Sequence, residues 1–267
     1  MFADARHGGV FRLGLDGSTS MIVEHRRGIG GLVLHDDGGL VVTGRNLAYK
    51  AAGRQTAVLV DRDEEQQRFG FNDLTTDGRG RIYAGSVAFN GMEADLGAVK
   101  VAAGSIYLVE LDGSVRRVAD DIKICNGVAL SPDGATLYMS DTGRQVVFAY
   151  DVDPESGDLS NRRVLLQTAQ GRPDGIAVAQ DGTIWLALAF AGKVVRYDAS
   201  GQERETIDLP TPMVTSLCFA RGDAQTLYIV TGVEERGSTD RAHVFSIETD
   251  VPGAAVAPAR VRVAQAA

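Results

Sequence analysis

The stretch SPDGATLYMSDTGRQVVFAYDV, from Ser131 to Val152, decides the fold, because AQDGTIWLALAFAGKVVRYDASG, from Ala179 to Gly201, repeats it with only small offsets. Each copy contains a turn rich in Asp and Gly, an apolar run, a loop and a second apolar run that ends near an Asp. Short runs of Val, Ile, Leu and Tyr between Gly, Asp, Asn and Pro are typical of β-hairpins. The repeat therefore predicts β-structure built from copies of one unit.

Four looser copies complete the set, and they begin at Phe2, His35, Thr76 and Ala220. Such copies recur roughly every 40 to 55 residues, which is the length of a four-stranded propeller blade. A β-sandwich does not predict six similar units, and a solenoid would use shorter repeats. We therefore predict an all-β, six-bladed β-propeller in which residues 1–267 form a single domain. The first copy begins in mid-repeat at Phe2, so the first blade is expected to lack its first strand, whereas the other five copies are expected to be complete.

Charge and composition exclude several classes of partner. The net charge is −8 and the pI is near 5.0, so the chain would repel a phosphate backbone, and nucleic acid is not an expected partner. The sequence has no apolar run of the ~20 residues that cross a bilayer, so a membrane is not expected either. The start, MFADARHGG, lacks the basic and apolar regions of a signal peptide, and we expect a cytoplasmic protein.

Three polar residues stand just ahead of a repeat. They are Asn72 in RFGFNDLTTDG, Asn126 in KICNGVALSPDG and Asp174 in GRPDGIAVAQDG. Any one of them alone is explained as a turn former. Together they precede apolar strands at nearly the same offset, and a ring of blades would point them at one axial site. Two amide oxygens and a carboxylate suit Ca²⁺, Mg²⁺ or Mn²⁺ better than Zn²⁺.

The same phrases carry a family resemblance. N-D-x-x-x-D-x-x-G-R-I-Y-A-G at Asn72 to Gly85, N-G-V-A-L-S-P-D-G-x-T-L-Y-x-S-D-T at Asn126 to Thr142 and P-D-G-I-A-V-x-x-D-G-x-I-W at Pro173 to Trp185 are the matching motifs. They resemble the regucalcin, gluconolactonase and luciferin-regenerating-enzyme family. The resemblance implies a six-bladed propeller with one divalent metal ion, Ca²⁺ first and Mg²⁺, Mn²⁺ or Zn²⁺ as alternatives. It also implies hydrolysis of a small lactone or related ester by a metal-activated water.

Carried over residue by residue, the resemblance implies that Asn126 and Asp174 are metal ligands and that Asp174 is the catalytic base. It implies that Asn72 binds the metal either directly or through water and substrate. Asn72 is also implied as a substrate-binding residue. Arg68 lies two residues before the place where the family often has its substrate-binding Arg, so it is either a shifted substrate ligand or a surface arginine. Glu93, in FNGMEADLGAVK, is either a replacement for a family acid at the substrate or a solvated loop charge.

One family residue has no counterpart. The metal-binding Glu of the family stands in an E-G-P phrase ahead of the part that resembles FADARHGG, and this sequence begins after that point. Either the chain as given lacks a natural N-terminal segment, or the protein builds its metal site with one carboxylate fewer. The alternatives to a lactonase are therefore a non-catalytic propeller that binds a ligand or a protein, and an organophosphate triesterase that uses the same metal site.

Overall fold

The computed structural model describes residues 1–14, 16–24, 26–66, 68–88, 103–221, 225–233 and 241–263. These residues form twenty-two β-strands, and no helix occurs among them. The strands make six antiparallel sheets, each built from strands that follow one another in the chain. The predicted all-β, six-bladed β-propeller is confirmed. The chain divides into two compact units, so the single domain over residues 1–267 stays a prediction.

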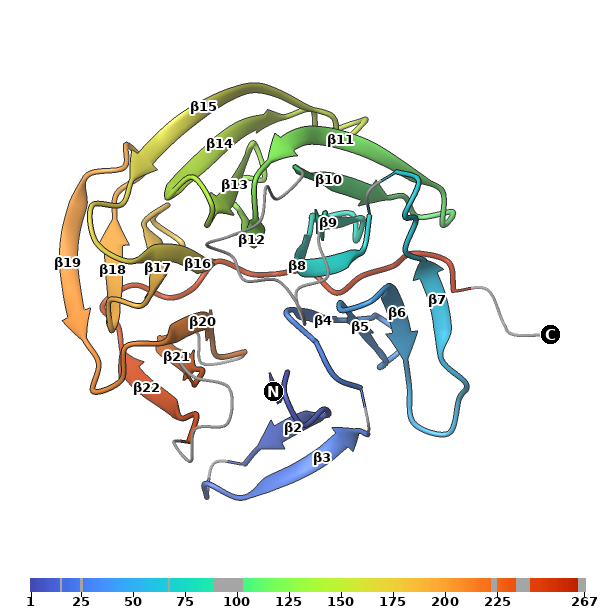
Figure 1. Ribbon diagram of the computed structural model, residues 1–267, viewed down its shortest axis with the longest axis horizontal. Helices are drawn as coiled ribbons and strands as arrows, with labels where there is room; N and C mark the ends of the chain where they lie inside the picture. Colours follow the sequence, from blue (N-terminus) through green and yellow to red (C-terminus); the bar gives the residue numbers. More distant parts are fainter. Residues whose placement is uncertain are drawn as a thin grey trace. The chain divides into compact units, whose positions relative to one another are not determined.

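The N-terminal unit, residues 1–125 with 256–267, holds three sheets (Figure 1). The first sheet comprises β1 (Phe2–Ala3), β2 (Val10–Leu13) and β3 (Thr19–Val23). The second comprises β4 (Leu32–Leu34), β5 (Leu40–Val42), β6 (Leu47–Lys50) and β7 (Ala57–Val60). The third comprises β8 (Gly70–Thr76), β9 (Ile82–Val87), β10 (Gly104–Val109) and β11 (Val115–Ile122).

The C-terminal unit, residues 126–255, holds the other three sheets. The fourth sheet comprises β12 (Cys125–Leu130), β13 (Thr136–Asp141), β14 (Val146–Val152) and β15 (Leu159–Gln167). The fifth comprises β16 (Arg172–Val178), β17 (Ile184–Ala189), β18 (Lys193–Tyr197) and β19 (Glu203–Asp208). The sixth comprises β20 (Val214–Phe219), β21 (Thr226–Thr231) and β22 (Val244–Glu248).

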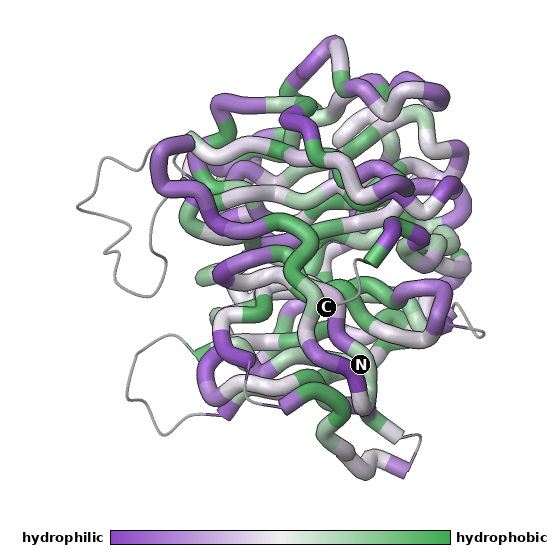
Figure 2. Tube along the Cα trace, turned by 90° about the vertical axis from the view of Figure 1, so that its right-hand side faces the viewer, coloured by the Kyte–Doolittle hydropathy of each residue, from purple (hydrophilic) through white to green (hydrophobic). Residues whose placement is uncertain are grey.

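Burial explains why the repeat reads as apolar runs. In the fifth sheet the second strand is covered on both faces, since every residue of β17 is buried, whereas the last strand β19 is largely exposed. The same repeat position is fully buried in four sheets, where it is filled by Ile82, Leu137, Ile184 and Leu227. Hydrophilic residues (purple in Figure 2) gather at many of the turns, and hydrophobic ones (green) lie mostly in the strands.

The Asp of the repeat closes the turn between the first two strands of a sheet. Asp133 Oδ1 accepts a hydrogen bond from Ala135 N (3.0 Å), and Asp181 Oδ1 accepts one from Thr183 N (2.9 Å). The glycine that follows each aspartate has a positive φ, 72° at Gly134 and 84° at Gly182, which a residue without Cβ adopts at little cost. The Asp-Gly pair therefore stabilises the hairpin turn between the first two strands.

The first and last sheets have three strands each among the described residues. In the first sheet, β1 pairs with β2 and β2 pairs with β3. Laid on the repeat, β1 takes the place of a second strand, and no described residue supplies the counterpart of the strand that carries Asn72 or Asp174 elsewhere. This agrees with the expectation for the first blade. The last copy looked complete in the sequence, but its sheet stops at β22 and has no counterpart of β19 in the part of the chain described.

Residues 257–262, the C-terminal strap, complete the core of the N-terminal unit (red in Figure 1). Ala259 bonds the backbone at Leu34 and Asp36, while Arg260 N and Arg262 N donate to Gly80 O (2.9 Å) and Leu111 O (2.8 Å). The strap thus joins turns of two neighbouring sheets. Ala259 is 0% exposed and Val261 is 1% exposed, and both belong to the same apolar cluster as strands β5, β8 and β9.

A buried histidine fixes the strap. His35 Nε2 lies 3.0 Å from Val261 O, and His35 Nδ1 lies 2.9 Å from Asp37 Oδ1. Burial alone would raise the pKa of Asp37, but hydrogen bonds from Tyr49, Gly39 and His35 together lower it to about 2. Asp37 is therefore ionised at neutral pH and holds the imidazole in place.

The strap yields a stability prediction. Replacing Val261 by Ala removes two buried methyl groups and should lower the free energy of unfolding by roughly 2 kcal/mol. Urea denaturation, followed by the far-UV circular dichroism of the backbone, measures this change. Val256→Ala is the matched control, because Val256 is 54% exposed and should give almost no change. Equal stability of the two variants would show that the strap does not support the core.

Candidate functional site

A β-bulge at the start of β16 presents Asp174. The register between β16 and β17 shifts between Pro173 and Ile176, so residues 174 and 175 interrupt the regular ladder. Bulges re-aim side chains and are frequent beside active sites. Asp174 is partly buried.

Asn126 stands at the corresponding place on β12 and is held by Thr142. Asn126 Nδ2 lies 3.2 Å from Thr142 Oγ1, and the same hydroxyl donates to Pro173 O at 2.7 Å. Thr142 is 8% exposed and directly follows β13. One hydroxyl therefore joins the Asn126 side chain to the backbone beside Asp174, and the structure brings these two predicted residues together.

A glycine permits the close approach of β12 and β16. A Cβ on Gly127 would lie 2.3 Å from Asp174 O and 2.6 Å from Ile176 N, both backbone atoms. A contact under 3.0 Å to backbone is not tolerated without a shift of one strand. The Asn-Gly pair thus has two functions: the asparagine supplies an amide, and the glycine lets the next strand carry Asp174 alongside it.

Asn72 occupies a matching bulge in the N-terminal unit. The register of β8 on β9 shifts between Phe71 and Leu74, as the register of β16 shifts around Asp174. Asn72 Nδ2 donates to Cys125 O (3.0 Å), and Thr43 Oγ1 donates to Asn72 O (2.7 Å). A Cβ on Gly30 would lie 2.4 Å from Asn72 Oδ1, so a glycine again makes room for the site residue.

The sixth sheet repeats the bulge with different chemistry. The register of β20 on β21 shifts between Val214 and Ser216, which puts Thr215 at the bulge. A Cβ on Gly175 would lie 2.7 Å from Ser216 Cα, so β16 and β20 approach as closely as β12 and β16 do. The equivalent offsets seen in the sequence are therefore equivalent places in the fold, but only some of them carry a side chain of the predicted ligand set.

The donor set is made of oxygen atoms. Among the described residues, no three His, Cys, Asp or Glu side chains lie together as a metal-binding group. Because Asn126 and Asn72 use their Nδ2 atoms as hydrogen-bond donors, their Oδ1 atoms point away from those partners. Amide oxygens beside a carboxylate suit a hard divalent cation and provide no soft nitrogen or sulfur ligand. The residues present thus fit Ca²⁺, Mg²⁺ or Mn²⁺ better than Zn²⁺.

Of the two predicted substrate ligands, the structure describes Arg68 but not Glu93. Arg68 Nε donates to Asp61 O (3.0 Å), and its guanidinium lies 4.8 Å from the centre of the Tyr107 ring. The Arg68 side chain is only 12% exposed, and its Nη2 atom also lies 3.8 Å from Asp63 Oδ2. Glu93 lies outside the described residues. Substrate binding by Arg68 and Glu93 stays a prediction.

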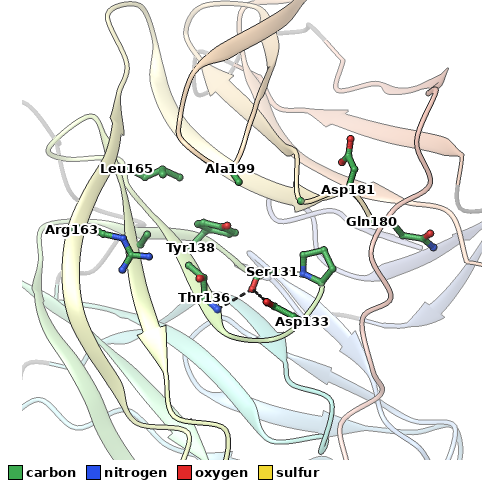
Figure 3. Close-up of a pocket in the computed structure, with 12 residues that line it drawn as sticks. Ser131, Asp133, Thr136, Tyr138, Arg163, Leu165, Gln180, Asp181 and Ala199 are labelled. Atoms are coloured by element: carbon green, nitrogen blue, oxygen red, sulfur yellow. Dashed lines mark hydrogen bonds between the residues drawn. The ribbon is translucent and has the colours of Figure 1, made fainter.

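A groove of about 430 Å³ lies at the other end of the strands (Figure 3). It is bordered by the turns at Ser131 to Thr136 and at Gln180 to Gly182, with Tyr138 and Arg163 along its side. Ser131 follows Asn126 by five residue steps along the strand, which is roughly 16 Å at the usual rise. This groove is thus distinct from the Asn126–Asp174 pair and contains none of the predicted site residues.

Sequence reasoning missed Thr142 and Gly127 as parts of the site. Both stand inside the matching motifs, Thr142 in S-D-T and Gly127 in N-G, but neither side chain is a usual ligand of a divalent cation. The sequence signal for Thr142 is its place just after an apolar run. The signal for Gly127 is that a glycine directly follows Asn126, as Gly175 directly follows Asp174.

Comparisons with known proteins agree in family and fold. The chain matches the family described as the SMP-30/gluconolactonase/LRE-like region over residues 1–233. A 6-deoxy-6-sulfogluconolactonase of Pseudomonas putida is 32% identical over 266 residues, which cover 95% of this chain and 88% of that protein. The pentonolactonase XacC of Haloferax volcanii is 32% identical over 210 residues, covering 76% and 67%. A solved luciferin-regenerating enzyme has a TM-score of 0.80 at 22% identity, covering 92% and 86%.

Proposed function

Because the chain belongs to the SMP-30/gluconolactonase/LRE-like family, we propose that it is a metal-dependent hydrolase that opens small lactones. The match to a named lactonase along 95% of the chain supports the reaction class. The observation that carries the site is the Thr142 hydroxyl, which joins the Asn126 side chain to the backbone carbonyl of Pro173, next to Asp174. The expected partner is a small lactone or ester.

The proposed site uses Asn126, Asp174 and Asn72 to hold one divalent cation, Ca²⁺ by preference. When bound, such a cation polarises the lactone carbonyl and stabilises the oxyanion. Asp174 takes the proton from the attacking water as the oxygen of that water bonds to the carbonyl carbon. The ring carbon–oxygen bond then breaks, and the protonated Asp174 returns the proton to the leaving alkoxide. The product is the open hydroxy acid, and Asp174 is again a carboxylate.

Substrate contacts are part of the same proposal. The Asn72 amide oxygen would orient a substrate hydroxyl or a water, and Arg68 would reach a substrate only by leaving Asp61 and Tyr107. Glu93 is proposed as a further substrate contact from its place in the sequence. We also propose a cytoplasmic location. In the described part of the chain, no helix is long and apolar enough to cross a membrane.

Metal removal tests the function. After dialysis against EDTA, ring opening of five- and six-membered sugar lactones should fall by at least about 100-fold, because the carbonyl loses its Lewis acid. Adding back Ca²⁺, Mg²⁺, Mn²⁺ or Zn²⁺ one at a time should restore the rate, with Ca²⁺ expected to be best. Acid release is measured with a pH indicator.

The same assay separates the alternatives. Hydrolysis of a phosphotriester in preference to every lactone would support the organophosphate reaction at this site. Metal binding without hydrolysis of either class would support a binding propeller. Undiminished lactone opening after complete metal removal would contradict the proposed mechanism.

A further inference from the structure

We propose that Thr142 is a positioning residue that determines which atom of the Asn126 amide faces the metal and that anchors the bulge carrying Asp174. This inference rests on the proposed function, because it assigns Asn126 and Asp174 to one cation. It adds a residue that touches neither the cation nor the substrate.

The donors and acceptors available on Thr142, Pro173 and Asn126 determine the direction of each hydrogen bond. A threonine hydroxyl has one hydrogen to donate and two lone pairs to accept with. Pro173 O can only accept, so at 2.7 Å it takes the hydroxyl hydrogen of Thr142. Asn126, at 3.2 Å, must then offer an N–H to Thr142. The amide is held with Nδ2 toward Thr142 and Oδ1 toward the opposite side.

The orientation matters because the two ends of an amide are chemically unequal. The carbonyl oxygen can ligate a cation, whereas the NH₂ group has no lone pair to give. Without the hydroxyl, rotation about the last side-chain bond of Asn126 costs little, since that torsion is broad and roughly two-fold. A rotated amide would present hydrogens to the cation. Thr142 removes this alternative.

The turn that follows β13 makes Thr142 rigid. Asp141 is 0% exposed, and its Oδ1 accepts from Gly143 N and Arg144 N, both at 3.1 Å. Its Oδ2 accepts from Arg144 Nη1 at 2.7 Å. Thr142 itself is buried and β-branched, so its χ1 angle is restricted. The hydroxyl therefore has a fixed position relative to β12 and β16.

Comparison of the repeats shows that the hydroxyl is not required by the fold. Laid on the Thr136–Val152 copy, the Thr183–Ala199 copy has Ala189 in the place of Thr142. The N-terminal unit, in contrast, has Thr43 after β5, whose hydroxyl accepts from Gly31 N (2.8 Å) and donates to Asn72 O (2.7 Å). Thr142 and Thr43 each donate a hydrogen bond to the backbone of the first strand of the next sheet, β16 and β8 respectively. Both of these strands carry a predicted site residue.

Thr142→Val tests the assignment, since valine keeps the shape and removes both hydrogen bonds. Calcium affinity, measured by isothermal titration calorimetry, should fall about 10- to 100-fold, as for other residues that orient metal ligands. Thr142→Ser keeps the hydroxyl and should restore affinity to within about threefold of wild type, which a purely packing role would not predict. Thr142→Ala repeats the test with a smaller side chain in case valine prevents folding.

Thr231→Val is the matched control. Thr231 is also buried, at 5% exposed, and its hydroxyl accepts from His243 N at 2.9 Å. This variant should lose stability without losing calcium affinity. Equal affinity of Thr142→Val and wild type, or equal losses in Thr142→Val and Thr231→Val, would overturn the positioning role.

The outcomes also separate this inference from the proposed function. If the wild type binds Ca²⁺ and opens lactones while Thr142→Val binds as well as wild type, only the positioning role is wrong. If the wild type binds Ca²⁺ but opens no lactone, the proposed function is wrong, and the affinities still decide the role of Thr142. If the wild type binds no divalent cation, both are wrong.

Discussion

Asp174→Asn should lower kcat for lactone opening by about 1000-fold, within the range measured for loss of a general base. Asparagine has nearly the same shape, but it cannot take a proton from water at neutral pH. It also removes the only carboxylate of the proposed ligand set, so calcium affinity should fall as well, because affinity at hard-cation sites follows ligand charge. Steady-state kinetics at saturating lactone and calorimetric calcium titration measure the two effects.

The control for this variant is a substitution in the turn between β16 and β17. Asp181→Asn makes the same chemical change at the other end of β16, where the carboxylate serves the β16–β17 turn. It should leave kcat within a factor of about two, since surface changes away from a site have small effects. If Asp174→Asn keeps more than about a tenth of the wild-type kcat, Asp174 is not the base, because loss of a general base costs far more.

Gly127→Ala should lower both the stability and the activity of the protein strongly. The new Cβ would meet Asp174 O at 2.3 Å and Ile176 N at 2.6 Å, so β12 and β16 must move apart. Overpacking of this kind costs about 3 kcal/mol in the free energy of unfolding. Activity should also fall roughly 100-fold in the folded fraction, because a displacement of about 1 Å at the reacting group has that effect.

Urea denaturation and kinetics on the same preparation separate the two losses. Gly78→Ala is the matched control, because no heavy atom lies within 4 Å of its Cβ position. That variant should change the unfolding free energy by no more than about 0.5 kcal/mol. Normal stability and activity of Gly127→Ala would show that the two strands are not held at the described distance.

The repeat made the architecture predictable, because the buried strand positions and the Asp-Gly turns are local properties of the sequence. The offset of Asn72, Asn126 and Asp174 ahead of each repeat also corresponds to real structure, since Asn72 and Asp174 stand in equivalent bulges. The bulges themselves could not be predicted, because a bulge is defined by the pairing partner of a strand and not by its own residues.

Other features depend on contacts between distant residues. The hydroxyl of Thr142 bonds Pro173 O only in the folded chain. The contact of the Arg68 guanidinium with the Tyr107 ring likewise could not be predicted from the sequence. The last sheet was expected to be complete because its apolar runs resemble the repeat, yet the chain after β22 contributes to the strap at residues 257–262 instead of to a fourth strand.

The C-terminal strap has a consequence for biosynthesis. A ribosome delivers the strands of the N-terminal unit first, but Ala259 and Val261, which fill its core, are delivered only after the whole of residues 126–255. The unit made first is therefore the last to be closed. Until then the nascent chain exposes the apolar surface around β5, β8 and β9, the kind of surface that chaperones bind and that promotes aggregation.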